Sequence, residues 1–221
     1  MNVIAVNGSP RKDWNTGILL KSALEGAESV GAQTKLVHLY DLSYKGCTSC
    51  FSCKRKGNTC NGLCVMRDDL RDVLAEVLGC DALVLGSPIY FGDVTGETRS
   101  FLERLLFPNI SYDEFGKSTY GRQVSCGLFF TMNCPEEFVE TVHYDVLLEH
   151  HARTMRILNG ATEVLTSHET YQFEDYSVMN AAMFDVDAKV RRRAEQFPVD
   201  CRNAREMGVR LSGSGKERKR L

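Results

Sequence analysis

The first seventeen residues constrain the fold of this chain more than any other segment. An apolar run at Asn2–Asn7 (NVIAVN) is followed by a polar loop at Gly8–Gly17 (GSPRKDWNTG) and then by a helical pattern that starts near Ile18. A buried strand, a loop rich in hydrogen-bond donors and a helix start form the arrangement with which α/β proteins bind phosphate. The sequence therefore predicts an α/β fold with a phosphate site at its first strand.

The polar residues of this loop suit a phosphate group. Ser9 and Thr16 bring hydroxyls, Asn15 brings an amide, and Arg11 brings a guanidinium fork, while Gly17 closes the loop. The helix N-terminus adds unpaired backbone N–H groups and a partial positive charge. The loop has neither Walker A nor dinucleotide-fingerprint spacing, so the phosphate belongs to something other than ATP or a Rossmann-bound NAD. Helix capping alone is the alternative explanation of these residues.

Strand and helix signals alternate along the rest of the chain. Strands are predicted at Asn2–Asn7, Thr34–Leu39, Asp81–Ser87, Val124–Thr131 and Ala161–Ser167. Helices are predicted at Thr16–Val30, from Asp68 to Gly79, at Gly96–Leu106, from Pro135 to Leu158, and from Asp185 to Gly208 with a break at Pro198. This pattern predicts a three-layer, doubly wound parallel sheet of five strands in the flavodoxin-like order 2-1-3-4-5. We expect one domain over 1–210, a cysteine-rich insertion at 44–64 and a flexible basic tail at 211–221.

A second loop, GSPIYFGDVTGE at Gly86–Glu97, follows the third strand. Strands one and three flank the switch point of this strand order, where ligands bind, so both loops should face one crevice. Tyr90 and Phe91 stand between small residues that let the backbone approach a flat ring closely. A phosphate loop beside a ring loop indicates a phosphorylated planar heterocycle, and FMN fits this description.

Four pieces of the sequence resemble the NAD(P)H-dependent FMN reductase group of the flavodoxin-like superfamily, including its iron–sulfur flavoprotein branch. They are VNGSPRKDWNTG at the N-terminus, GCTSCFSCKRKG in the middle, CVMRDDL before the second helix and GSPIYFGDVTGETRSFLERL after the third strand. Together they cover much of the chain from Val6 to Leu105, whereas the second half carries weaker signals.

The resemblance implies an FMN-binding role for three loops. By this resemblance, the phosphate would be held by Ser9, Arg11, Asn15, Thr16 and Gly17, and the isoalloxazine ring would be lined by Pro88, Ile89, Tyr90, Phe91 and Gly92. The family's third flavin loop would be Thr131, Met132 and Asn133. Trp14 departs from the family, which often has a small residue there; it either stacks near the ribityl chain or lies on the surface.

The cysteine-rich segment allows three interpretations. Cys47, Cys50 and Cys53 form CxxCxxC, and such a run with a fourth cysteine can hold a [4Fe-4S] cluster. Spacing makes Cys60 the fourth ligand, whereas the flanking motif makes it Cys64. The alternatives are a zinc site and free thiols beside the flavin.

The resemblance implies an FMN-dependent oxidoreductase. NAD(P)H would reduce the flavin, which would pass electrons to a quinone, a free flavin, a nitro or azo compound, or a metal ion. Because the flavin performs this chemistry, no catalytic side chain is predicted. The alternatives are an iron–sulfur electron carrier with a ferredoxin-like partner and a binding module without redox activity. The family implies a homodimer or homotetramer, with Phe107–Gly121 as a candidate contact.

Composition and charge lead to expectations about membrane spans, location and partners. The net charge is −2 over 221 residues, and no apolar run approaches the ~20 residues of a membrane span. Nine cysteines without a recognisable secretion signal predict a cytoplasmic protein. The basic C-terminal region is most simply a solvated surface, so no nucleic-acid partner is expected.

Overall fold

A parallel sheet forms the centre of the computed structural model, which describes residues 1–217, with side chains as far as Gly213. The strands are β1 (Asn2–Asn7), β2 (Gln33–His38), β3 (Ala82–Tyr90), β4 (Asp93–Val94), β5 (Val124–Thr131) and β6 (Asn159–Ser167). The parallel strands stand in the order β2-β1-β3-β5-β6, and β4 pairs antiparallel with β3. The predicted fold class and strand order are confirmed, since the predicted fourth and fifth strands are β5 and β6.

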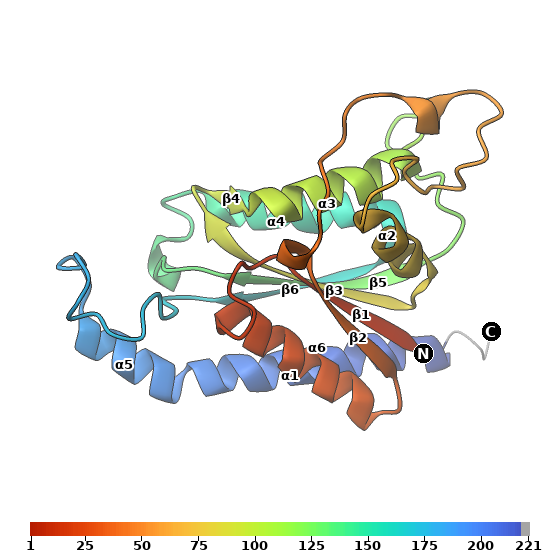
Figure 1. Ribbon diagram of the computed structural model, residues 1–221. Coiled ribbons are helices and arrows are strands. Elements are labelled where there is room, and N and C mark those ends of the chain that lie inside the picture. The colour runs from red at the N-terminus through yellow and green to blue at the C-terminus, as the bar shows by residue number, and fades with distance from the viewer. Residues whose placement is uncertain (218–221) are drawn as a thin grey trace.

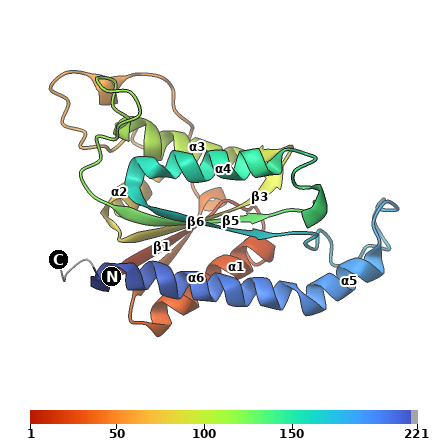
Figure 2. The same ribbon diagram turned by 180° about the vertical axis from the view of Figure 1, so that it is seen from behind.

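Six α-helices cover the two faces of this sheet in the described residues. They are α1 (Asn15–Ser29), α2 (Leu70–Gly79), α3 (Gly96–Leu106), α4 (Tyr144–Met155), α5 (Val186–Glu195) and α6 (Phe197–Glu217). One face carries α2, α3 and α4, and the other carries α1 and α6, with α5 continuing the line of α6 (Figures 1 and 2). The central strands β3 and β5 are apolar almost throughout because helices bury both of their faces.

Each face has its own hydrophobic core. On the α2–α3–α4 face, Leu74, Phe101 and Met155 are almost fully buried against the sheet. On the other face, Leu20 of α1 packs in one cluster with Met207 of α6. The two cores hold the carboxyl ends of β1, β3 and β5 at one edge of the sheet, where the candidate site lies.

Two predicted helix boundaries are wrong. The helix predicted from Pro135 begins only at Tyr144, after a short 3₁₀ turn at Glu136–Phe138. His143 has a φ of 59°, a left-handed conformation that an α-helix cannot continue through. The break predicted at Pro198 lies two residues earlier, at Gln196, because α5 ends at Glu195 and α6 begins at Phe197. Pro198 therefore lies in the first turn of α6, where its missing N–H costs nothing.

The basic tail predicted for 211–221 is helical as far as Glu217. Leu211 is only 2% exposed and packs with Ala204 and Met207 in the core of the α1–α6 face. This burial extends α6 beyond the predicted end of the last helix. Residues 218–221 lie outside the described residues.

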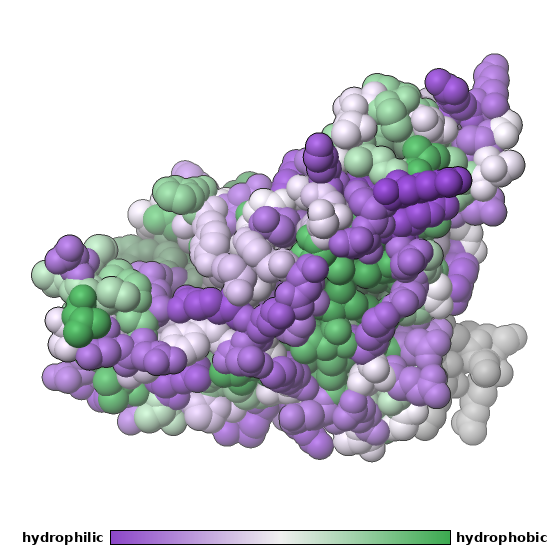
Figure 3. Space-filling view, viewed as in Figure 1, coloured by the Kyte–Doolittle hydropathy of each residue, from purple (hydrophilic) through white to green (hydrophobic). Residues whose placement is uncertain are grey.

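The cysteine-rich segment projects beyond the C-terminal end of α3, at the upper right of Figure 1. It is irregular apart from a 3₁₀ turn at Ser52–Lys54. Figure 3 shows apolar (green) surface beside hydrophilic (purple) surface at the upper right, where this segment lies. Phe51 of the segment is 47% exposed. The ring of Phe51 packs edge-on against Phe107, with 5.9 Å between the ring centroids. The segment is therefore an appendage of α3 and lies outside the sheet.

Candidate functional site

The loop that follows β1 is held in place by its own polar groups. Ser9 donates its backbone N–H to the side-chain oxygen of Asn7 at 2.9 Å, and the Ser9 hydroxyl accepts the backbone N–H of Arg11 at 3.2 Å. Ser9, Asn15 and Thr16 are each no more than 5% exposed. The predicted phosphate loop is thus largely buried, whereas the Arg11 side chain reaches its surface.

The N-terminus of α1 lacks the cap that helices ordinarily have. Trp14 occupies the N-cap position, no side chain accepts a hydrogen bond there, and the first turn holds no acidic residue. By contrast, α3 is capped by Thr95, whose hydroxyl accepts the backbone N–H of Thr98. The first N–H groups of α1 and its positive end are therefore open to an anion, as a phosphate site requires.

The first and second loops meet directly. The backbone N–H of Gly8 donates to the carbonyl of Gly86 at 2.8 Å, and the Thr95 hydroxyl donates to the carbonyl of Gly8 at 2.7 Å. A Cβ on Gly8 would lie 1.8 Å from the Thr98 hydroxyl oxygen, so only glycine fits this crossing. The two loops lie side by side, as their strand positions predict.

The third loop joins the other two at the end of β5. The hydroxyls of Thr16 and Thr131 are hydrogen-bonded at 2.8 Å, which links the first loop to the third. Thr131 and Met132 are buried, and the amide oxygen of Asn133 accepts a 2.5 Å hydrogen bond from Lys189 of α5. All three loops singled out in the sequence thus converge at the carboxyl ends of β1, β3 and β5.

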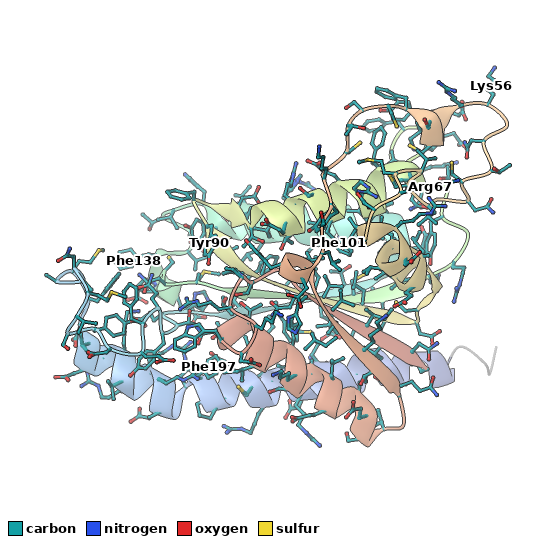
Figure 4. All side chains as sticks on the ribbon, viewed as in Figure 1. Lys56, Arg67, Tyr90, Phe101, Phe138 and Phe197 are labelled. Carbon is teal, nitrogen blue, oxygen red and sulfur yellow. The ribbon has the colours of Figure 1, made fainter. Side chains whose placement is uncertain are left out.

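The ring-loop aromatics stand at the tip of a tight hairpin between β3 and β4. Phe91 and Gly92 both have positive φ, 51° and 80°, as a two-residue hairpin turn requires. Tyr90, labelled in Figure 4, is 43% exposed. Phe91 is fully exposed, while Pro88 and Ile89 are half-buried. The hairpin therefore exposes its aromatic surface and does not contribute it to the core.

A buried histidine anchors this hairpin, a role that no local sequence pattern indicates. His151 of α4 is 4% exposed, and its Nε2 lies 2.9 Å from a carboxylate oxygen of Asp93, the first residue of β4. The same oxygen accepts the backbone N–H of Val94 at 2.7 Å. Its partner Asp93 is 58 positions away in the sequence, so the helical pattern around His151 does not indicate the contact.

We expect His151 to make folding stability depend on pH. Burial lowers its pKa, and the hydrogen bond with Asp93 offsets this only in part; His150 and Arg99 also face it and lower the pKa further. Below about pH 6.5 the unfolded state therefore binds a proton that the folded state does not, and stability falls as the pH falls. His151→Gln, whose amide can still donate to Asp93, should reduce this loss by up to about 1 kcal/mol between about pH 7.5 and pH 5.5.

Urea unfolding at the two pH values measures this difference. His150→Gln is the matched control, because His150 is exposed and adjacent. The control should keep most of the wild-type pH dependence, because His150 lowers the pKa of His151 less than burial does. Equal pH dependence in the wild type and His151→Gln would contradict the assignment.

Four cysteines face one small pocket of the projecting segment. Cys47, Cys50, Cys53 and Cys64 line it together, and Cys60 is not among its lining residues. The guanidinium Nε of Arg104, itself fully buried, lies 3.1 Å from the Cys64 sulfur. In the part of the chain that the structure describes, no three His, Cys, Asp or Glu side chains are arranged to hold a single metal ion.

Helix α3 connects this segment to the first loop. Its N-cap Thr95 contacts Gly8, while Glu103 and Arg104 near its C-terminal end bond the backbone N–H of Cys47 and the sulfur of Cys64. Nine residues along a helix correspond to a rise of about 14 Å. The cysteines and the first loop thus lie at opposite ends of α3 and form separate sites.

A family model described as NADPH-dependent FMN reductase matches residues 1–129. An iron–sulfur flavoprotein of Methanocaldococcus jannaschii is 34% identical over 104 residues, 47% of this chain and 51% of the relative. One of Archaeoglobus fulgidus is 32% identical over 128 residues, 58% of this chain and 60% of the relative. These matches span only about half to three-fifths of the curated relatives.

Solved structures extend the likeness of fold to almost the whole chain. An NAD(P)H:quinone oxidoreductase from Methanothermobacter marburgensis superposes with a TM-score of 0.66 at 13% identity, covering 96% of both chains. An azoreductase from Bacillus anthracis superposes with a TM-score of 0.63 at 12% identity, covering 95% of this chain and 99% of the other. Among the described helices, none is long and apolar enough to cross a membrane.

Proposed function

This chain belongs to the NADPH-dependent FMN reductase family, and from that premise we propose that it carries electrons from NAD(P)H through FMN to a second acceptor. The observation that carries the proposal is the convergence of three loops on the uncapped N-terminus of α1. Free backbone donors, buried hydroxyls and a nearby guanidinium suit the phosphate of FMN. Aromatic and small residues across the crevice suit its ring.

The residues of the site bind and orient the cofactor. Ser9, Thr16 and the backbone of Asn15 and Gly17 would hold the phosphate, with Arg11 closing over it. The hairpin Pro88–Gly92 would lie against the ring, and Thr131–Asn133 would bound it from the third side. Bound FMN would supply the chemistry, accepting a hydride from the nicotinamide and passing electrons on, so no side chain need act as acid or base.

The second acceptor is proposed as a small molecule such as a quinone or an azo compound. Support comes from the names of structural neighbours, a quinone oxidoreductase and an azoreductase. The other proposed acceptors are a free flavin, a nitro compound and a metal ion. We further propose a cytoplasmic homodimer or homotetramer, in which the exposed Tyr112 and Phe115 of the segment Phe107–Gly121 contact a neighbouring copy.

Anaerobic mixing of the FMN-loaded protein with NADPH and, separately, with NADH tests the reductase function. We expect the flavin absorbance to bleach with at least one of them and to return on addition of a quinone or an azo dye. A protein that retains FMN but is reduced by neither nicotinamide would contradict the reductase function while leaving FMN binding intact.

The cysteine pocket favours one alternative, an iron–sulfur electron carrier with a ferredoxin-like partner. Cys47, Cys50, Cys53 and Cys64 share one pocket, and matched relatives are named iron–sulfur flavoproteins. In a [4Fe-4S] cluster each thiolate binds its own iron, so the sulfurs need not converge on one point. The buried cation of Arg104 suits a thiolate at Cys64, which makes Cys64 a better fourth ligand than Cys60.

Iron and sulfide analysis after anaerobic purification separates the two functions. The carrier predicts iron in the wild type and in Cys60→Ser, and its loss in Cys64→Ser. Cys60→Ser is the matched control, since its thiol belongs to the same segment but not to the pocket. An iron-free wild type that oxidises NAD(P)H steadily would contradict the carrier function and support the reductase function.

A further inference from the structure

A buried lysine lies against the third loop. Lys189, near the start of α5, is only 5% exposed. Its ammonium donates to the amide oxygen of Asn133 at 2.5 Å and to the backbone carbonyl of Glu169 at 3.4 Å. The same ammonium lies 5.1 Å from the centroid of the Phe184 ring. Among the described residues, no carboxylate forms an ion pair with it.

A lysine with this environment is unusual in a protein interior. Lysine side chains are almost never buried unless a negative group pairs with them, because a charge removed from water is costly. Burial lowers the pKa of Lys189, and the carboxylate of Glu169, which is beyond ion-pair distance, offsets this only in part. The positive charge of Lys189 is therefore incompletely balanced by the protein, and it would stabilise a further negative charge near the third loop.

Lys189 also fixes the orientation of the Asn133 amide. An ammonium group can only donate hydrogen bonds, so the atom that it meets is the amide oxygen, and the NH₂ group of the amide points away from it. Asn133 is half-buried, and its amide nitrogen neither has a partner among the described residues nor belongs to their buried unpaired atoms. The two N–H donors of this amide are therefore accessible to a ligand.

The rest of the third loop is held from neighbouring elements. The hydroxyl of Thr131 bonds that of Thr16 in the first loop, and the backbone of Met132 donates to the carbonyl of Ser167 at 3.0 Å. Two residues of chain span at most about 7 Å. The backbone of Asn133 thus lies within that distance of Thr131, where the first and third loops meet.

We propose that Lys189 is a positioning residue of the flavin site, which orients the NH₂ group of Asn133 toward a carbonyl oxygen of the isoalloxazine ring and favours the reduced ring by its positive charge. This inference rests on the proposed FMN site. Both carbonyl oxygens of the ring lie on its pyrimidine edge, so an amide donor suits that edge. Reduction by a hydride adds two electrons and one proton, so the ring gains one negative charge, which a buried cation stabilises.

The reduction potential of bound FMN tests this role. In Lys189→Met, which has an uncharged side chain of similar shape, reduced FMN should lose about 10-fold more affinity than oxidised FMN. The midpoint potential should then fall by about 30 mV, the change that a factor of ten causes in a two-electron couple. Anaerobic titration with dithionite beside a reference dye measures it. Arg191→Met, which removes a positive charge from an exposed position on the same helix, is the control and should keep the wild-type potential.

Asn133→Asp is the second variant and carries the test if Lys189→Met does not fold. Its carboxylate can still accept the hydrogen bond from Lys189, but it balances the ammonium and removes the NH₂ donors, so the potential should again fall.

A wild-type potential in Asn133→Asp or in folded Lys189→Met would overturn the inference. Equal weakening of oxidised and reduced FMN would also overturn it, because a purely structural role has that effect. A wild type that binds no FMN would contradict the proposed function itself. A wild type that binds FMN and is reduced by NAD(P)H, beside unaltered potentials in both variants, would contradict the role of Lys189 alone.

Discussion

Arg104→Met should lower the free energy of unfolding by about 3–5 kcal/mol, the cost of removing one partner of a buried ion pair. The Arg104 side chain is fully buried, and all five of its N–H donors can be satisfied. Two guanidinium nitrogens bind the two carboxylate oxygens of Asp68 at 2.7 and 3.0 Å. The other acceptors are the carbonyls of Lys45 and Met66 and the sulfur of Cys64.

This single side chain therefore joins both ends of the cysteine-rich segment to α3, and its loss leaves the Asp68 carboxylate without its cation and takes a donor from two carbonyls. Urea unfolding of the wild type and the variant measures the effect. Arg99→Met is the matched control: Arg99 lies on the same helix, is half-exposed and has only a 3.7 Å ion pair with Glu103, so about 0.5 kcal/mol or less is expected. Equal losses in the two variants would contradict the role of Arg104.

Acid should weaken the same interaction. The hydrogen bond from Arg104 is the main cause that lowers the pKa of Asp68 below its ordinary value. A depressed carboxyl pKa contributes stability above about pH 4, which is lost as the pH falls through the lower folded-state pKa. The stability difference between the wild type and Arg104→Met should therefore shrink below about pH 4 in the same urea titrations.

Arg11→Gln should raise the FMN dissociation constant on the order of 10- to 100-fold, because a hydrogen bond between charged groups contributes about 1.5–3 kcal/mol. Arg11 is the cation that reaches the phosphate loop from its surface, and the stacked Trp14 ring orients it. Riboflavin, which has no phosphate, should bind the variant and the wild type with similar affinity. Fluorescence titration with both flavins measures the effect.

Lys12→Gln is the control for Arg11→Gln. Lys12 is the adjacent cation in the same loop, but its ammonium pairs with Asp41 at 2.6 Å on the surface. It should change FMN affinity by much less than Arg11→Gln. An equal loss in both variants would indicate a general effect of loop charge, and no loss in Arg11→Gln would exclude Arg11 from the phosphate site.

The sheet was predictable because its signals are local. The apolar runs at Asn2–Asn7 and Val124–Thr131 begin and end where β1 and β5 do, and Gly96–Leu106 has the bounds of α3. Parallel strands joined by helices leave few possible orders, so the meeting of the first two loops followed from the strand order alone. The hairpin strand β4 escaped prediction because two residues, Asp93 and Val94, are too few to form a pattern.

The contacts that complete the site join residues that are far apart in the sequence. Trp14 meets Tyr171 across 157 positions, and Arg104 meets Cys64 across 40, so no spacing rule relates either pair. Sequence spacing favoured Cys60 as the fourth member of the cysteine group. Spacing along the sequence takes no account of how the chain turns. In the structure, Cys64 lines the pocket and its sulfur lies 3.1 Å from the Nε of Arg104, and Asn61 and Gly62, both with positive φ, turn the chain between Cys60 and Cys64. Which of the two cysteines would bind a cluster stays a prediction.

Titration of the flavin-free protein with FMN tests directly whether the three loops at the carboxyl ends of β1, β3 and β5 form one FMN site. We expect saturable, stoichiometric quenching of flavin fluorescence, with FMN bound more tightly than riboflavin because α1 and Arg11 meet the phosphate. No binding of FMN, or equal affinity for FMN and riboflavin, would contradict it.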